Sequence, residues 1–500
     1  MRGLRRSIPP VDRFARVAGA GRSFIIAAAL LHCSGPGGAR AAECVFPDNV
    51  DWVVGASCEV SAIRIAPQDL TINNGATLTV ESSGEIILDM RNFAINVAPD
   101  SRLVVEPGGR VRSNQIGPLL VRQSDGGTFG YFLKQVGGPV LDTINPDLSF
   151  HPSSAIKVLY MIEALRQVDN GTLNLATTNM VSCPTVVTPG PGQTCPNSFT
   201  NPTTAAGGGG NCGQNAALVA NSMASCGQPT VAVGLGVGIC AMMKISNNAA
   251  ANATQETVGG GNPGTGWNNM LNNAGAAIGL TSTTFASRMG CNAPFANNPI
   301  NQATLRDLGR IYEQMTTNAA VLFPTSPPAP FVFQNSAAYL FMDNDQNELA
   351  FATAIVNEQA AEAGIDAATT QNFRNNILLV HKTGSNTSNS IPGCNVGILC
   401  LPGCPGPGLP PNPPNCPDPS QPLYRTAAGW ISLPINGGAD TLDYVYGVFV
   451  DNVTASSIIA TGTAPNADPA MPAVSIIDGS MLDEAGELLR PVIRNALENF

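Results

Sequence analysis

The ten residues HPSSAIKVLY, at positions 151–160, decide how the rest of the chain is interpreted. Pro152 favours a turn, and the apolar residues after it keep helical spacing until a predicted stop at Gly171. Ser154 and Lys157 are three residues apart, so they share one face at the start of this predicted helix. A hydroxyl and an amine placed in this way can act as nucleophile and base, provided that a desolvated site removes the proton of the lysine.

Lysine is rare in this chain, which makes the lysine of this stretch more significant. Of the 25 basic residues only four are lysines: Lys134, Lys157, Lys244 and Lys382. A chain that uses arginine for nearly all of its positive charge keeps lysine where a removable proton matters. We therefore expect Lys157 to have a chemical role.

The composition predicts a globular protein of two or more domains with long loops. Hydrophobic residues make up 44% of the 500 residues, charged residues only 12%, and there are 52 glycines and 40 prolines. Without its first 41 residues the chain would carry 18 basic and 34 acidic residues, a net charge of about −16. This charge argues against nucleic acid as a partner.

The first 41 residues have the pattern of a secretory signal peptide. Seven arginines precede residue 42, the apolar run Phe24–Leu31 is short, and Ala39-Arg40-Ala41 offers a cleavage site. Weaker alternatives are a lipoprotein signal at Cys33 and a twin-arginine signal at Arg5 and Arg6. We expect an exported protein, periplasmic or extracellular, with no transmembrane segment in the mature chain.

The cysteines favour disulfides over metal binding. Twelve of the 13 cysteines follow the predicted signal peptide, and an even number suits pairing in an oxidising compartment. The chain has no Cys-x-x-Cys pair, and only two histidines would survive processing. We therefore expect no zinc site and no cofactor.

Residues 43–117 are predicted to form a β-rich repeat domain. Leu70, Ile72, Leu78 and Val80 recur 25 residues later as Ile95, Val97, Leu103 and Val105. Each copy reads as strand, turn, strand, which indicates coils of a small β-solenoid; a β-sandwich meander is the alternative. No catalytic cluster occurs here, so we expect a capping, adhesion or spacer role.

Residues 118–500 are predicted to form an α+β domain. Strands are expected at 129–136, 140–144, 377–380, 427–433 and 443–451, and helices at 267–278, 304–316 and 481–500. Two insertions rich in Cys, Gly and Pro interrupt the domain at 181–240, with a helical segment near 216–224, and at 391–422. The order predicts an antiparallel sheet built from both ends of the domain.

Three motifs occur in order: Ser154-Ala155-Ile156-Lys157, Ser246-Asn247-Asn248 and Lys382-Thr383-Gly384. Together they resemble the penicillin-recognising serine hydrolases, which include class A β-lactamases and D-alanyl-D-alanine peptidases. The resemblance covers about residues 125–500. It implies a β-lactamase- or transpeptidase-like domain, with an antiparallel sheet and a helical cluster, after the small all-β region.

The resemblance also implies roles for individual residues. It makes Ser154 the acylated nucleophile, Lys157 its base, Ser246 a proton relay to the leaving nitrogen and Asn248 a ligand of the substrate amide. The Lys382, Thr383 and Gly384 segment would line the site, and backbone N–H groups of Ser154 and Ser385 would form an oxyanion hole. Arg425 or Thr426 would hold the substrate carboxylate. The implied substrates are β-lactams or peptidoglycan stem peptides.

Two departures from the family bear on turnover. Asn247 stands where class A enzymes usually carry aspartate. Those enzymes also place a deacylating glutamate in a loop after the middle motif, whereas residues 257–306 contain no Asp or Glu, and Glu256 lies too close to Asn248. The sequence therefore predicts acylation without the usual deacylation base, unless Asp307, Glu348 or Glu358 supplies one.

Other interpretations remain open from the sequence. The chain could be a carboxypeptidase-like peptidoglycan enzyme, an esterase or amidase, or a non-catalytic binding protein with this fold. Ser246-Asn247-Asn248 could simply cap a helix. A triad with His151 or His381 is a weaker alternative, since no Gly-x-Ser-x-Gly elbow is present.

Overall fold

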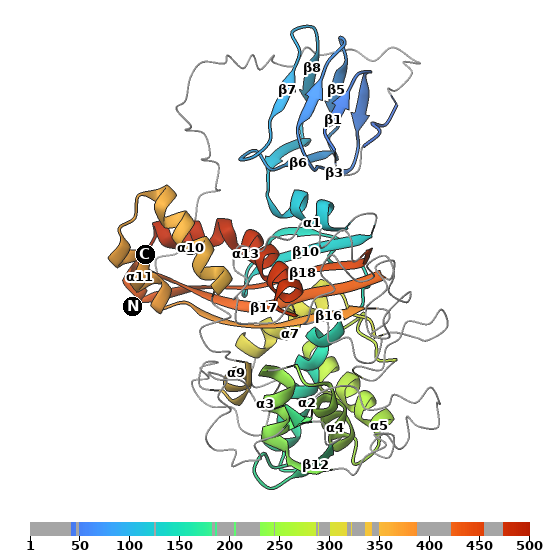
Figure 1. Cartoon of the computed structure of the whole chain (residues 1–500), viewed down its shortest axis with the longest axis vertical. Coiled ribbons are helices and arrows are strands. Elements are labelled where there is room, and N and C mark those ends of the chain that lie inside the picture. The colour runs from blue at the N-terminus through green and yellow to red at the C-terminus, as the bar shows by residue number, and fades with distance from the viewer. Residues whose placement is uncertain are drawn as a thin grey trace, which may run out of the picture. The chain divides into compact units, whose positions relative to one another are not determined.

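The computed structural model describes residues 42–46, 50–124, 127–182, 186–187, 205–206, 231–244, 246–286, 289, 301–317, 322, 336–342, 350–387, 422–454 and 474–500 (Figure 1). The predicted signal peptide, the helical segment near 216–224 and nearly all of the insertion at 391–422 lie outside these residues.

The repeat at 43–117 forms three coils of short strands. The strands are β1 (Trp52–Val54), β2 (Cys58–Val60), β3 (Ile63–Ala66), β4 (Leu70–Ile72), β5 (Thr77–Val80), β6 (Glu85–Leu88), β7 (Ile95–Val97), β8 (Arg102–Val105) and β9 (Arg110–Ser113). They make three parallel sheets, in the orders β1-β4-β7, β2-β5-β8 and β3-β6-β9. Each sheet takes one strand from every coil, which is the arrangement of a β-solenoid.

The 25-residue sequence repeat is the pitch of this coil. Leu70 pairs with Ile95 and Leu78 pairs with Leu103, as the repeat predicts. Parallel pairing of this kind favours the solenoid hypothesis over the antiparallel meander. Residues 43–500 form one compact unit, so a domain boundary near residue 117 stays a prediction.

A disulfide closes the first coil. Cys44, which lies just before β1, is bonded to Cys58 at the start of β2. Cys240 is also disulfide-bonded. The other cysteines of the predicted mature chain lie outside the described residues, so the prediction that most of them are paired stays a prediction.

A five-stranded antiparallel sheet forms the centre of the second region. Its strands are β10 (Thr128–Gln135), β11 (Val140–Ile144), β16 (Leu378–Thr387), β17 (Pro422–Ile435) and β18 (Asp440–Thr454). Their order is β11-β10-β18-β17-β16. The first two strands come from the start of the region and the last three from its end, which confirms the predicted α+β arrangement.

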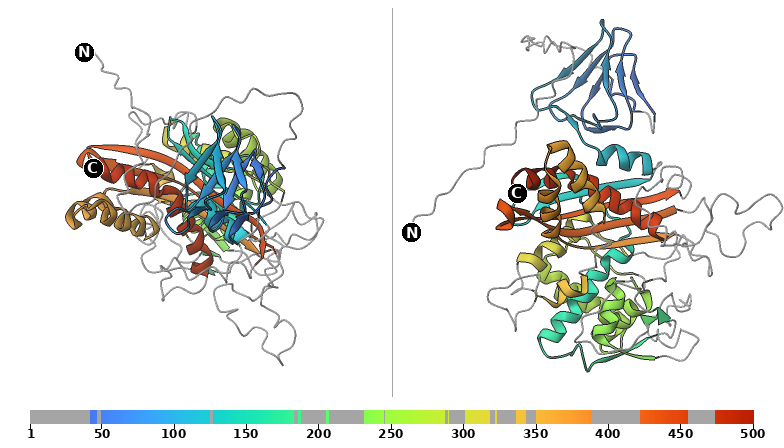
Figure 2. Two further views of the ribbon diagram at one scale, coloured as in Figure 1. Left: turned by 90° about the horizontal axis from the view of Figure 1, so that it is seen from above. Right: turned by 60° about the vertical axis from the view of Figure 1, so that its left-hand side comes forward.

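Both faces of this sheet are covered by helices (Figures 1 and 2). One face packs on α1 (Ile116–Ser124), α10 (Ala350–Ala363), α11 (Ala367–Asn375) and α13 (Val474–Glu498). The other faces α2 (Lys157–Asp169), α3 (Leu235–Lys244), α4 (Asn248–Val258), α7 (Leu305–Thr317) and α9 (Ala337–Met342). Neighbouring Ala427 and Ala428 of β17 belong to opposite cores, because side chains alternate along a strand.

The remaining described elements lie mainly around the helical cluster. The helix expected at 267–278 is part of a longer run made of α5 (Pro263–Asn269), a π-helical turn (Met270–Gly275) and α6 (Ala276–Ile278). Strand β12 (Asn179–Ser182) pairs antiparallel with β15 (Val231–Gly234), and β13 (Val186–Val187) pairs with β14 (Ala205–Ala206). These strands show that part of the insertion at 181–240 returns to the helical cluster.

Candidate active site

Ser154 lies in a tight 3₁₀ turn, η1 (Ser153–Ile156), which continues directly into α2 at Lys157. The sequence predicts one helix from this point; the structure begins instead with a 3₁₀ turn, whose first residue, Ser153, has a left-handed φ of 47°. A non-glycine residue at positive φ is strained, and such strain is common at functional sites. Ser154 is half-buried, whereas Ser153 is only 4% exposed, so Ser154 is the more accessible hydroxyl.

His151 supports the turn and is uncharged at neutral pH. Its Nδ1 accepts a hydrogen bond from the backbone N–H of Ser153 at 2.9 Å. Burial lowers the pKa of His151 to about 4. The accepting Nδ1 fixes the neutral tautomer with its proton on Nε2, and the bond goes to Ser153 rather than to Ser154.

Lys157 is fully buried, and its amine contacts the second motif. Nζ donates to the backbone oxygen of Ser246 at 2.5 Å, to Ser246 Oγ at 3.1 Å and to Asn248 Oδ1 at 2.6 Å. Burial, and then the nearby charge of Lys382, holds the pKa of Lys157 well below its usual value. A lysine in this environment can give up its proton and accept another.

No hydrogen bond joins Ser154 Oγ to the Lys157 amine within the described structure. The two side chains are nevertheless held one turn apart at the junction of η1 and α2. Hydrogen bonds between catalytic groups are often long without substrate and tighten when it binds. The free structure therefore leaves Ser154 available as the predicted nucleophile.

The second motif combines a helix cap with contacts to the site. Asn247 is the N-cap of α4, where its Oδ1 accepts from the backbone N–H of Ala250 at 2.8 Å. Its neighbours Ser246 and Asn248 bond to Lys157, and Ser246 has a left-handed φ of 55°. The capping hypothesis is thus correct for Asn247, while the two flanking residues reach the site.

The third motif runs along β16 against the start of η1. A Cβ added to Gly384 would lie 2.4 Å from Pro152 O and 2.8 Å from Ser154 N. Real Cβ atoms never approach so closely, so only glycine allows this strand to pass the backbone of Ser154. Lys382 lies two residues earlier on the same face of β16, is almost fully buried, and is close enough to lower the pKa of Lys157.

The positions of the other two predicted residues of β16, Thr383 and Ser385, are defined by the strand geometry alone. Thr383 is half-buried and, by alternation, lies on the opposite face from Lys382 and Gly384. The backbone of Ser385 pairs with Arg425 in the ladder between β16 and β17. The side chain of Ser385 lies outside the described part of the structure.

The two residues of β17 that could hold the substrate carboxylate point in opposite directions. Arg425 is 1% exposed, and its guanidinium lies 3.5 Å from the carboxylate of Glu484 on α13. Thr426 pairs with Gly384 on the site face and donates its hydroxyl to Val448 O at 2.9 Å. The structure therefore places Arg425 away from Ser154, and only Thr426 stays beside the site.

His381 is packed into the core instead of a triad. Burial, and then the charge of Lys382, lowers the pKa of His381 to about 3. Its ring meets Phe351 of α10 edge-on, with centroids 6.0 Å apart. This neutral ring lies on the face of β16 opposite to Lys382, so it does not support the histidine-triad alternative.

Sequence reasoning missed an anchor between α4 and the acid-free stretch 257–306. Asn252 exchanges two hydrogen bonds with the backbone of Met289: its Nδ2 donates to Met289 O, and its Oδ1 accepts from Met289 N, each at 3.0 Å. Asn252 lies one helical turn after Asn248, roughly 6 Å along α4. The backbone of Met289 is therefore held near the surroundings of Lys157, and its side chain is buried and apolar.

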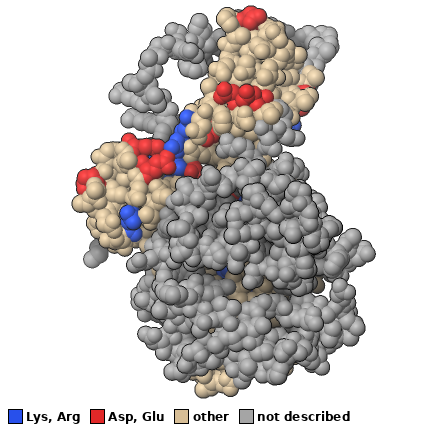
Figure 3. Space-filling model, viewed as in Figure 1, with Lys and Arg blue, Asp and Glu red and all other residues tan. Residues whose placement is uncertain are grey.

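The carboxylates considered as substitutes have other partners. Asp307 is buried and accepts from Ser282 N at 2.8 Å and Thr283 Oγ1 at 2.9 Å. Glu358 lies in a cluster of ion pairs on α10, which includes Arg490 of α13 at 2.9 Å. Figure 3 shows acidic and basic side chains adjoining on this surface. Glu348 lies outside the described residues.

Part of the chain matches a known family. Residues 112–204 match the sequence model of the Beta-lactamase enzyme family, and this segment contains Ser154 and Lys157. The match confirms, for this segment, the resemblance to the penicillin-recognising serine hydrolase superfamily. No curated protein matches the chain.

Solved structures similar to the chain include a β-lactamase from Sphaerobacter thermophilus, with 16% sequence identity and a TM-score of 0.41, covering 75% of this chain and 94% of that one. A class A β-lactamase from Bacteroides cellulosilyticus has 14% identity and a TM-score of 0.39, with 75% and 96% covered. A mutant of PBP-A, solved as an acyl-enzyme with penicillin G, has 16% identity and a TM-score of 0.38, with 75% and 96% covered.

A membrane-spanning helix was also sought. Among the helices of the described residues, none combines the length and the apolar character needed to cross a bilayer. The predicted signal peptide and export of the chain stay predictions, because residues 1–41 are not described.

Proposed function

We propose that the protein is a serine hydrolase that is acylated by β-lactams on Ser154 and releases the product slowly. The observation that carries this proposal is the environment of Lys157. Its amine is buried, has a strongly lowered pKa, and is held by Ser246 and Asn248 one turn from an accessible serine. General bases for serine nucleophiles need this combination of proximity and a removable proton.

In the proposed acylation, the neutral amine of Lys157 accepts the proton of Ser154 as Oγ attacks the lactam carbonyl. The carbonyl oxygen becomes negative and is stabilised by backbone N–H groups at the contact between η1 and β16, where Gly384 allows the two segments to meet. The lactam C–N bond then breaks. The proton on Lys157 passes through Ser246 Oγ, 3.1 Å away, to the leaving nitrogen.

Release of the acyl group needs a water activated by a general base, and none of the candidate carboxylates that the structure describes is placed for that role. Met289 stands where the acid-free stretch is anchored to α4, while Asp307 and Glu358 bond elsewhere. Loss of a general base typically slows a reaction by about 10²- to 10⁴-fold. We therefore expect a burst of one β-lactam per protein and then slow release.

The same observation favours a second candidate. A site that is readily acylated but slowly hydrolysed would also suit a carboxypeptidase-like enzyme of peptidoglycan, for which penicillin is an inhibitor. The anchored Met289 supports this alternative as well as it supports a slow β-lactamase. Turnover of a D-alanyl-D-alanine peptide, measured beside a chromogenic cephalosporin, separates the two.

A fluorescent penicillin tests the proposal directly. The protein should be labelled covalently, and mass spectrometry of its peptides should place the adduct on Ser154. An adduct on Ser153, or no adduct in correctly folded protein, would contradict the proposal. The absence of any adduct would leave a non-catalytic protein with this fold as the better interpretation.

A further inference from the structure

The two ends of the β-solenoid are finished differently. At the start, the chain just before β1 folds over the first coil. Phe46 packs on Trp52 with ring centroids 4.2 Å apart, and the guanidinium of Arg64 lies 4.7 Å from the centre of the Phe46 ring. Trp52 is consequently only 1% exposed. The first coil is thus capped by its own chain, as the terminal repeat of a solenoid needs to be.

The last coil, residues 95–113, leaves the interior of the solenoid open. Val54, Ile72 and Val97 follow one another from coil to coil in a single inward column, and they are 3%, 0% and 44% exposed. Val105, which continues a second inward column, is 45% exposed. The apolar interior therefore reaches the surface at this end, and an exposed apolar patch of this kind is typical of an interaction site.

The last coil also has free strand edges. Strands β7, β8 and β9 each stand at the end of their own sheet. In β8, the backbone N–H groups of Arg102 and Glu106 donate to the preceding coil, each at 2.9 Å. Because backbone groups alternate in direction along a strand, the N–H and C=O groups of Leu103 and Val105 point away from that coil. An edge of this kind is a template for pairing with a further strand.

The chain that follows β9 leads away from this edge. Helix α1 packs on the outer face of the third sheet, where a Cβ at Gly117 would lie 3.3 Å from Ile65 of β3 and 3.4 Å from Ile87 of β6. Both strands belong to the first two coils. Figure 1 shows β7 and β8 at the end of the stack opposite to β1.

We propose that a second copy of the chain binds to this open end, about a two-fold axis that passes through Val104. The axis sets β8 antiparallel to β8 of the second copy. Leu103 of each copy then lies opposite Val105 of the other, and their free N–H and C=O groups form four hydrogen bonds. Of the antiparallel registers of β8, this one uses the free groups of both residues in both copies.

The same rotation pairs the other two edges. Strands β7 and β9 lie on either side of β8 in the coil, so the rotation places β7 of one copy beside β9 of the other. Val97 and Val111 are each seven residues from Val104, and they come to lie opposite each other. Their backbone groups are also free, because the neighbouring N–H groups of Ala98 and Arg110 donate to the preceding coil. All three sheets therefore continue into the second copy in one register.

The side chains of β8 fit a second copy better than an unrelated strand. In this register Arg102 of each copy faces Glu106 of the other on the outer side, and both side chains are exposed. Opposite charges placed across from each other stabilise an antiparallel pair. On the inner side, Leu103 meets Val105, so each copy covers the open interior of the other. The capped first coil offers no equivalent edge, so the assembly closes at two copies.

Sedimentation equilibrium of the full chain tests whether the dimer exists. We expect twice the mass of one chain, with a dissociation constant below about 10 µM. The mass of a single chain at about 100 µM would overturn the proposal.

A lysine at the two-fold axis tests whether the dimer uses this end. Val104 is 40% exposed and points outward, so Val104→Lys keeps the coil intact and brings two positive charges together across the axis. Its dimer should be at least about tenfold weaker. Val53→Lys changes an equally outward valine, 57% exposed, on β1 at the capped end, and should leave the dimer unchanged. Unchanged association in Val104→Lys would overturn the proposal.

Exchanged charges test the register. Arg102→Glu and Glu106→Arg each set like charges opposite one another at both ends of the β8 pair, and each should weaken self-association by about threefold to tenfold. In an equimolar mixture the two variants should associate with each other as tightly as the original chain does, because each supplies the charge that the other lacks. This recovery also shows that both variants fold. A mixture that associates no better than either variant alone would overturn the proposed two-fold pairing.

Discussion

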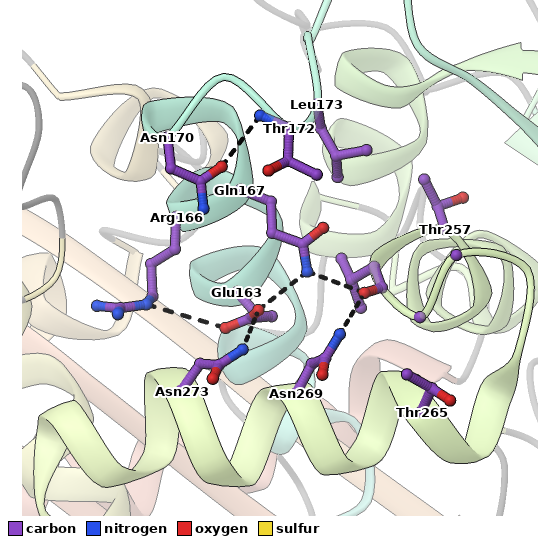
Figure 4. Close-up of a pocket in the computed structure, with 13 residues that line it drawn as sticks. Glu163, Arg166, Gln167, Asn170, Thr172, Leu173, Thr257, Thr265, Asn269 and Asn273 are labelled. Carbon is purple, nitrogen blue, oxygen red and sulfur yellow. Dashed lines mark hydrogen bonds and ion pairs between the residues drawn. The ribbon is translucent and has the colours of Figure 1, made fainter.

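The two ends of α2 solve the same problem in opposite ways. At its start, burial and then the nearby charge of Lys382 lower the pKa of Lys157. Six residues later Glu163 is buried, and its Oε1 accepts hydrogen bonds from the amides of Gln167 and Asn273 (Figure 4). The buried lysine is therefore arranged to lose a proton, whereas the buried glutamate is supplied with hydrogen-bond donors.

This difference teaches how one helix can carry two kinds of polar site. A buried charge must be neutralised or supplied with hydrogen-bond partners. Lys157 can be neutralised by giving up a proton, which is useful to a base. Glu163 is supplied with amide donors instead, and Arg166 Nε lies 3.9 Å from its other carboxylate oxygen.

The largest expected effect comes from removing the hydroxyl at the first end. Ser154→Ala should abolish covalent labelling by fluorescent penicillin, since no other atom would carry the acyl group. Ser153→Ala is the matched control and should keep its label, because that hydroxyl is buried beside His151. Labelling of Ser154→Ala would break the comparison by placing the reaction elsewhere.

The contact between β16 and η1 should come next. Gly384→Ala adds a Cβ that would meet Pro152 O and Ser154 N at 2.4 and 2.8 Å, so strand or turn must shift. A misplacement of about 1 Å can cost about a hundredfold in rate, and we expect acylation to slow by roughly that factor. Gly437→Ala, in the open turn between β17 and β18, controls for a general loss of stability. Unchanged acylation in Gly384→Ala would show that this contact does not position Ser154.

A carboxylate at the anchored loop position should raise turnover by a smaller factor. Met289→Glu places an acid where Asn252 holds the backbone near Lys157. If a general base is what the site lacks, steady-state release of a chromogenic cephalosporin should rise by at least about tenfold. Met289→Gln has the same shape without the charge and should not accelerate release. Equal rates for the two variants would mean that release is limited by something other than a base.

The smallest effect expected concerns pH. Only the neutral amine of Lys157 can accept a proton, so acylation should rise with pH as this amine deprotonates and should fall at lower pH. Lys382→Met removes the positive charge that helps to lower the pKa of Lys157, so the pKa should rise and the rising limb should move to higher pH. Lys134→Met, a lysine paired with Glu313, is the control and should leave the limb in place. If the rising limb stays in place in Lys382→Met, the charge of Lys382 does not influence the pKa of Lys157.

Local pattern explains which parts of the fold could be predicted. The solenoid repeat was readable because the residues that stack, such as Leu78 and Leu103, are related by one constant spacing. The strands of the second region were readable for a similar reason. A strand buried on both faces is largely apolar, as residues 427–433 of β17 are.

The site was predictable only in part, because motifs identify residues but not directions. Arg425 and Thr426 were equal candidates in the sequence. Neighbouring residues of a strand point to opposite faces of the sheet, so only one of the two can lie on the face of Ser154, and the sequence does not say which. The bond between Asn252 and Met289 joins residues 37 positions apart, and no spacing rule connects them.

The disulfide between Cys44 and Cys58 has a mechanical consequence. Strand β1 lies at the edge of its sheet, bound to β4 alone, and such a strand can peel away one hydrogen bond at a time when its end is pulled. Tension applied ahead of Cys44 passes instead through the sulfur bridge to β2. Residues 45–57 then carry no load, and the first coil can resist a pull along the chain that would otherwise unwind it.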